Sequence, residues 1–208
     1  MKDFPLAVLL SGGGTTLQNL LDQIAAGSFP IRIVQVISSN PQALGIERAT
    51  RANLPVSVIR RKDHPTSASF GEAVFGRCAA AGAELVCMAG FLQLVPIPSA
   101  FAGRVMNIHP SLLPAFGGKG MFGIHVHEAV LAYGAKVTGC TVHFVDQEYD
   151  HGPIILQRAV PVQDDDTPKS LAARVFEQEC EAYPEAIRLF AEGRIQVQGR
   201  RVCLCQAK

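Results

Sequence analysis

The sequence predicts an α/β fold: a Rossmann-like, mostly parallel open sheet with helices on both faces and antiparallel strands toward the C-terminus. Short apolar runs alternate with amphipathic stretches through the first half of the chain, and this βαβ order builds a parallel sheet. Later apolar runs follow one another more closely, which favours antiparallel pairing. The 208 residues are 48% hydrophobic, enough for one core, so we expect a single domain over residues 1–208.

The expected strands are apolar runs bounded by turn residues. They lie at 6–10, 31–38, 56–59, 85–89, 105–108, 138–145 and 154–162, with a terminal hairpin at 195–204. Pro110 lacks the N–H that a ladder needs, so the fifth strand stops at His109. Helical spacing predicts helices at 17–24, 44–52, 70–81 and 125–132. A final helix begins at Pro168 and ends at 190 or 191, because proline favours the first helical position.

Composition excludes several classes of function. Lys+Arg number 19 and Asp+Glu 18, a net charge of +1, which gives no electrostatic reason to expect nucleic acid as a partner. No run resembles a signal peptide or approaches the length of a membrane span. The six cysteines are scattered, without C-x-x-C spacing, and suit reduced thiols. We therefore expect a cytoplasmic protein with small-molecule substrates and no membrane partner.

A glycine-rich turn, residues 11–16, joins the first strand to the first helix. Backbone N–H groups and the helix dipole at such a turn suit a phosphate. Leu17 stands where a dinucleotide fingerprint needs its last glycine, and the P-loop lysine is missing. One phosphate at Gly14, Thr15 and Thr16 is therefore the expected ligand, and a side chain at Gly14 is expected to block it. A purely structural turn is the alternative.

Asn107 and His109 lie two residues apart at the end of the fifth strand, so their side chains share one face. Asp150 follows a later strand. Amide, imidazole and carboxylate together can donate to an oxyanion, move a proton and hold the imidazole, which describes acyl transfer without a protein nucleophile. The alternatives are a buried amide with a core histidine, and Ser111 as a nucleophile, although no nucleophile elbow surrounds it.

Four other histidines raise the alternative of a zinc site. The H-x-H spacing lacks a third ligand at a fixed distance, so we expect no metal. The histidines concerned are His125, His127, His143 and His151.

The stretch from Asn107 to Pro114 resembles the signature of the folate-dependent formyltransferases. The glycine turn, residues 89–91, and the run from 142 through Asp150 to 155 occur in the same order in one member of that family. The similarity spans nearly the whole chain. It implies transfer of the formyl group of 10-formyltetrahydrofolate, as co-substrate, to the amine of glycinamide ribonucleotide in purine biosynthesis, without a metal.

The resemblance also implies site residues. Asn107 would polarise the formyl oxygen, His109 would move the proton, and Asp150 would hold His109. Gly14, Thr15 and Thr16 would bind the ribonucleotide phosphate. The rest of that substrate would meet Phe176, Glu177, Gln178 and Glu179, with Glu179 near the amine. Folate would be lined by Leu92, Gln93, Leu94, Val95, Asn107, Asp146, Gln147, Glu148 and Tyr149.

Three departures from the family concern substrate contacts. Thr15-Thr16 replaces a usual Ser-Asn, and the loop 117–123, with Lys119 at its tip, is long. An arginine common in the loop before the third helix has no match, the nearest position being about Ser67. The alternatives are a formyltransferase for another amine, a formyl-folate hydrolase, and a non-catalytic nucleotide-binding Rossmann protein. A monomer or a homodimer is expected.

Overall fold

The computed structural model describes residues 3–27 and 29–205. Its contacts divide the chain into two compact units, Met1–Asn107 and Ile108–Lys208. The strands form a seven-stranded sheet in the order β3-β2-β1-β4-β5-β6-β7, and β8 and β9 pair separately. The first five strands pair in parallel and β6 pairs with β7 antiparallel, which confirms the predicted fold class. The single-domain organisation stays a prediction.

The first unit contains the parallel strands. They are β1 (Phe4–Leu10), β2 (Ile31–Ser38), β3 (Val56–Val58), β4 (Leu85–Met88) and β5 (Val105–His109), whose last two residues belong to the second unit. The apolar run of β1 is buried on both faces from Leu6 to Leu10, as expected of a central parallel strand. The predicted strands therefore agree with the structure to within a residue or two.

The helices of the first unit are α1 (Thr15–Ala25), α2 (Leu44–Arg51) and α3 (Ser67–Ala80), with short 3-10 turns at Arg61–Asp63 and Ser99–Phe101. The connections through α1 and α2 lead from β1 to β2 and on to β3 at the edge of the sheet, and the connection through α3 leads back to β4 beside β1. Because such connections are right-handed, α3 lies on the opposite face of these strands from α1 and α2. α3 starts three residues earlier than predicted, because the Thr66 hydroxyl accepts from the Ser69 N–H and the Ser69 side chain bonds back to the Thr66 N–H.

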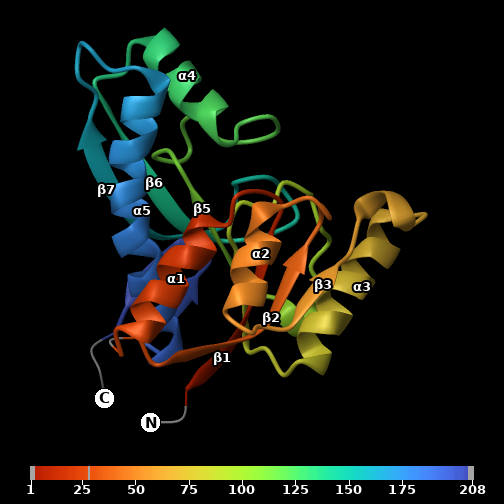
Figure 1. Ribbon diagram of the computed structural model, residues 1–208. Helices are drawn as coiled ribbons and strands as arrows, with labels where there is room; N and C mark the ends of the chain where they lie inside the picture. The colour runs from red at the N-terminus through yellow and green to blue at the C-terminus, as the bar shows by residue number, and fades with distance from the viewer. Residues whose placement is uncertain (1–2, 28, 206–208) are drawn as a thin grey trace. The chain divides into compact units, whose positions relative to one another are not determined.

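The second unit contains β6 (Val137–Phe144), β7 (Ile154–Pro161), α4 (Ile124–Tyr133), α5 (Pro168–Ala191), β8 (Ile195–Gln198) and β9 (Arg201–Leu204). The long helix α5 packs along both β6 and β7 and also touches α4 (Figure 1). Pro168 is the first residue of α5, as predicted, and Thr167 caps it through Ser170. No helix in the described part of the chain is long and apolar enough to cross a membrane.

The carboxyl ends of the strands carry the polar features on which the site depends. The glycine turn follows β1, His109 ends β5, and Asp150 lies in the loop between β6 and β7. Ligands of open α/β sheets bind at this edge.

Candidate active site

The second unit brings His109 and Asp150 together. His109 is 3% exposed, and its Nδ1 lies 3.5 Å from Oδ2 of Asp150, whose side chain is 11% exposed. Asp150 has a φ of 52°, a left-handed conformation that an aspartate adopts only with support from its surroundings. The backbone is therefore bent to aim this carboxylate at the histidine.

Two further groups hold the Asp150 carboxylate. The N–H of Gly118 donates to Oδ2 at 2.9 Å, and Nε2 of His143 lies 3.7 Å from Oδ1. His143 is buried on β6 and donates from Nδ1 to the carbonyl of Phe144 at 2.8 Å. From the sequence, His143 is part of a stretch that resembles the family and of the zinc alternative, but neither assigns it to the Asp150 carboxylate. Strand alternation predicts its burial but not its partner, and the Gly118 backbone donor leaves no signal in the sequence.

The charges of the pair follow from burial and from these contacts. Burial raises the pKa of Asp150, but the His143 hydrogen bond, the attraction of His109 and the Gly118 N–H outweigh it and hold that pKa below its usual value. Burial lowers the pKa of His109, and the attraction of Asp150 opposes this only in part. At neutral pH the site therefore contains an ionised carboxylate beside a neutral imidazole that can accept a proton.

The loop that follows β5 contacts both members of the pair. Nε2 of His109 donates to the carbonyl of Phe116 at 2.9 Å, because a carbonyl can only accept. Phe116 has a φ of 53° and precedes Gly118, the donor to Asp150. For Nε2 to accept a proton, this loop must release His109 and the ring must carry its own proton on Nδ1, which faces Oδ2 of Asp150.

Ser111 is not placed to act as a nucleophile. Its side chain is fully buried, and its hydroxyl donates to the carbonyl of Ala115 at 2.7 Å. Thr141 fixes the segment further: its hydroxyl donates to the Ser111 carbonyl at 2.6 Å and accepts from the Leu113 N–H at 3.0 Å. Burial and these contacts argue against Ser111 as a nucleophile.

Asn107 lies two residues before His109 on β5, paired with Met88 of β4. It is half-buried. Strand alternation directs its side chain to the same face of β5 as that of His109.

The glycine turn opens α1 without a side-chain cap and without an acidic residue in the first turn. The first N–H groups of such a helix suit an anion. Arg48 adds a nearby cation, since its Nε donates to the carbonyl of Gly13 at 2.9 Å. That a side chain at Gly14 blocks a phosphate stays a prediction, and the structure adds a second effect: a β-carbon there would lie 2.5 Å from Cα of Gly45, so such a variant would also disturb the contact with α2.

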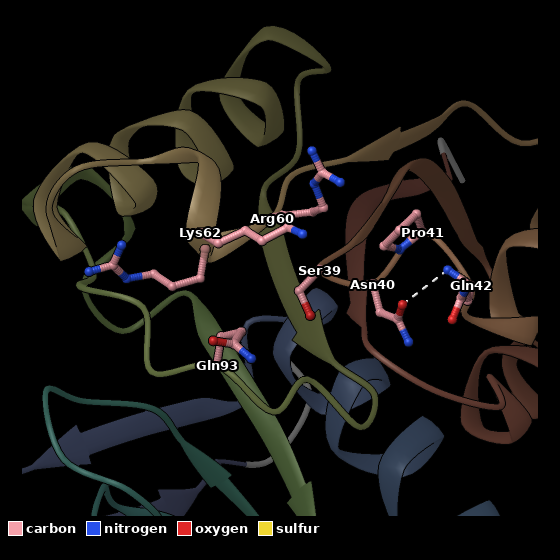
Figure 2. A pocket seen from close by; sticks show the side chains of 8 residues that line it. Ser39, Asn40, Pro41, Gln42, Arg60, Lys62 and Gln93 are labelled. Atoms are coloured by element: carbon pink, nitrogen blue, oxygen red, sulfur yellow. Dashed lines mark hydrogen bonds between the residues drawn. The ribbon is translucent and has the colours of Figure 1, made fainter.

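The first unit also contains a pocket of about 650 Å³ whose lining is rich in cations (Figure 2). Its residues come from loops at the carboxyl ends of β2, β3 and β4: Ser39, Asn40, Pro41, Gln42, Arg60, Arg61, Lys62 and Gln93. Arg61 donates from Nη2 to the hydroxyl of Ser67 at 3.3 Å. A guanidinium therefore lies beside Ser67, the position nearest to the family's missing arginine, in a polar loop whose sequence alone suggests a solvated turn.

The expected folate-contacting residues after β4 differ in exposure. Leu92 and Leu94 are 45% and 42% exposed, whereas Val95 is 2% exposed. The Leu92 N–H donates to the Ser11 hydroxyl at 3.0 Å, which fixes this segment to the end of β1. Leu92 and Leu94 can offer apolar side chains to a flat guest, while Val95 is part of the core and can offer only its backbone.

The loop between β6 and β7 presents the other expected folate contacts. Gln147, Glu148 and Tyr149 are exposed, and the Glu148 N–H donates to Oδ1 of Asp146 at 2.9 Å. This turn holds the loop backbone in one shape ahead of Asp150.

The four residues expected to meet the ribonucleotide form one turn of α5. Phe176, Gln178 and Glu179 are half-buried and Glu177 is exposed. Burial raises the pKa of Glu179 from 4.5 to about 7, so near neutrality this carboxyl can exist in either form.

The raised pKa of Glu179 makes stability depend on pH. The unfolded chain releases this proton near 4.5, whereas the folded chain keeps it until about 7, so stability falls as pH rises through this interval. The unfolding temperature of Glu179→Gln should therefore rise relative to wild type between pH 4.5 and 7. Glu177→Gln, an exposed neighbour, should show no such trend. A constant difference across the interval would contradict a Glu179 that keeps its proton to about pH 7 in the folded protein.

The zinc alternative gains no support from the described residues, among which no three His, Cys, Asp or Glu side chains form a group that could hold a metal ion. Besides His143, which lies beside Asp150, two of its histidines have carboxylate partners: Nδ1 of His125 lies 3.0 Å from Glu128, and Nδ1 of His151 lies 2.7 Å from Asp146.

Together the fold and this geometry define a class of protein: an α/β protein with a buried histidine–aspartate pair at the end of a parallel strand. A match to the family described as formyl transferase covers residues 5–187. The chain belongs to this family, whose members use 10-formyltetrahydrofolate as co-substrate.

Three relatives illustrate the likeness. The crystal structure of glycinamide ribonucleotide transformylase 1 from Symbiobacterium toebii has a TM-score of 0.92 at 45% identity, covering 99% of this chain and 95% of that one. Phosphoribosylglycinamide formyltransferase of Haemophilus influenzae is 35% identical over 195 residues, 93% of this chain and 90% of the relative. The trifunctional purine biosynthetic protein adenosine-3 of Gallus gallus is 40% identical over 201 residues, but the chain spans only 20% of its length.

Proposed function

We propose that this protein transfers the formyl group of 10-formyltetrahydrofolate to the amine of 5-phosphoribosylglycinamide in de novo purine biosynthesis. The observation that carries the proposal is the buried pair of His109 and Asp150, 3.5 Å apart, in a chain that matches the formyl transferase family over residues 5–187. The names of its relatives supply the amine substrate.

In the proposed reaction the substrate amine attacks the formyl carbon directly. A new C–N bond forms, and the carbonyl oxygen gains negative charge, to which the Asn107 amide donates. His109 takes the proton from the attacking nitrogen, and Asp150 stabilises the resulting imidazolium. The tetrahedral intermediate then collapses: the bond to N10 of the folate breaks, and His109 returns the proton to N10.

The substrates are assigned to surfaces by chemistry. The uncapped start of α1, at Gly14, Thr15 and Thr16, takes the ribonucleotide phosphate. The turn of α5 from 176 to 179 meets the rest of that substrate, with Glu179 toward its amine. Leu92 to Val95, Asn107 and the loop 146–150 take the pterin, whose flat ring suits apolar side chains and backbone donors. The cationic pocket of Figure 2, which includes Gln93 from the same segment, suits the folate's carboxylates.

The alternatives differ in what they need from the site. A non-catalytic nucleotide-binding protein needs no buried imidazole and carboxylate in contact, so the pair favours an enzyme. A hydrolase would use water in place of the amine, and a transferase for another amine would not need the phosphate site.

We also propose a cytoplasmic location, in keeping with the six free cysteines. A monomer or homodimer remains the prediction.

The experiment that tests the proposal measures tetrahydrofolate release from 10-formyltetrahydrofolate with glycinamide ribonucleotide, with other amines and with water alone. Release should depend on glycinamide ribonucleotide and should match formylated product one to one. Equal release without any amine would identify a hydrolase, and faster release with another amine would assign a different acceptor.

The phosphate site can be tested without disturbing the fold. Thr15 is exposed at the first position of α1, where a carboxylate stabilises a helix but repels a phosphate. Thr15→Glu should raise the KM for glycinamide ribonucleotide about tenfold or more, equivalent to roughly 1.4 kcal/mol of repulsion, with the unfolding temperature unchanged or higher. Thr15→Gln, similar in size and uncharged, should be mild. An unchanged KM in Thr15→Glu would place the phosphate elsewhere.

A further inference from the structure

The loop between β6 and β7 is held on both sides of its bend at Asp150. On one side, the Gly118 N–H and His109 contact the Asp150 carboxylate. On the other side, the next residue, His151, lies between two charged groups. Its Nδ1 is 2.7 Å from Oδ2 of Asp146, and its Nε2 is 3.0 Å from Nη1 of Arg200.

The partners indicate which ring nitrogen of His151 donates and which accepts. A carboxylate only accepts, so Nδ1 carries the proton, and a guanidinium only donates, so Nε2 is bare. These contacts favour the tautomer with its proton on Nδ1. Arg200 also donates from Nη2 to the backbone carbonyl of His151 at 2.7 Å. One guanidinium thus holds both the side chain and the backbone of the residue beside Asp150.

Arg200 comes from a part of the chain that the proposed mechanism does not use. It follows Gly199, φ 61°, in the tight turn between β8 and β9, whose strands pair from Gln198 and Arg201 outward. The base of this hairpin is fixed, because the Cys205 N–H donates to the Arg194 carbonyl at 2.8 Å and Nε of Arg194 donates to the Cys205 carbonyl at 3.1 Å. The hairpin therefore presents Arg200 from a closed support.

We propose that Arg200 is a positioning residue: through His151 it keeps the backbone at Asp150 in the bent conformation that aims the carboxylate at His109. The left-handed φ of Asp150 needs such an external restraint. Arg200 supplies it through charge-assisted hydrogen bonds to Nε2 and to the backbone carbonyl of His151. The planar guanidinium of Arg200 makes two contacts with His151, which fix the orientation of this residue as well as its distance. The single ammonium group of a lysine would not reproduce both contacts.

The kinetic test rests on the proposed formyl transfer. Arg200→Ala should lower kcat about five- to tenfold, as expected when a catalytic group is misplaced by less than about 1 Å, and Arg200→Lys should recover only part of the loss. Arg201→Ala removes the same charge one residue further along the hairpin and should change kcat less than about twofold. In an Asp150→Asn background, Arg200→Ala should cause little additional loss, because both changes act on one contact.

A second readout needs no substrate. Histidine NMR titration of the free protein gives the pKa of His109, a ring that faces Asp150, His143 and His127. Moving the Asp150 charge away lowers this pKa, so Arg200→Ala should shift it in the same direction as Asp150→Asn, and Arg201→Ala should leave it in place. An unshifted His109 in Arg200→Ala, or equal shifts for both arginines, would overturn the proposal. A shift specific to Arg200 in a protein that transfers no formyl group would support positioning and refute the proposed function.

Discussion

Asp150→Asn is expected to lower kcat by about a hundredfold or more, within the range that general acid–base groups contribute, and to change the KM of either substrate little. Asparagine keeps the shape and can still accept from the Gly118 N–H, but it loses the charge that stabilises the His109 imidazolium. That charge matters while the proton is in transit, so the loss falls on kcat.

The pH profile provides the independent check on Asp150. Activity requires neutral His109 and is lost as pH falls through its pKa. The Asp150 charge raises that pKa against burial, so Asp150→Asn should move the acid limb of the kcat profile to lower pH. Asp165→Asn, at an exposed carboxylate, serves as control. Near-wild-type kcat in Asp150→Asn would remove the assigned role.

Asn107→Ala is expected to lower kcat by about a hundred- to a thousandfold, the usual consequence of removing one oxyanion donor. The acid limb of the pH profile should stay in place, since His109 and Asp150 are untouched. Asn107→Asp is the matched variant: it keeps the shape but replaces the donor by a charged acceptor, and it should be at least as damaging. Because Asn107 is half-buried, unfolding temperatures must show that both variants fold. A folded Asn107→Ala with wild-type kcat would exclude it as the donor.

The fold could be predicted from the sequence because its signals are local. Pro110 ends β5 at His109 and Pro168 starts α5, each through an effect of its own ring on the backbone. The start of α3 was missed because Ser69, which completes the cap of Thr66, lies outside the apolar periodicity on which the prediction relied.

The candidate site could be predicted only in part, because contacts distant in sequence leave weaker signals. The contact of His109 with Asp150 was predicted from strand ends that share one edge. The carbonyl of Phe116 and the N–H of Gly118 are backbone groups, which every residue has, so residue identity could not predict their contacts with His109 and Asp150. A β-carbon added at Gly14 would clash with the Cα of Gly45. This contact depends on how α2 packs against the turn, so the sequence of the turn alone could not predict it.

The central claim is direct transfer from folate to the ribonucleotide amine by His109 and Asp150. The most direct measurement is a single-turnover quench with isotope-labelled formyl-folate, followed by mass spectrometry of the ribonucleotide, of formate and of the intact protein. The account predicts that the label appears only on the ribonucleotide, at a rate that falls in parallel with kcat in Asp150→Asn. Label on the protein would show a covalent intermediate, and label in formate would show hydrolysis; either result would contradict the account.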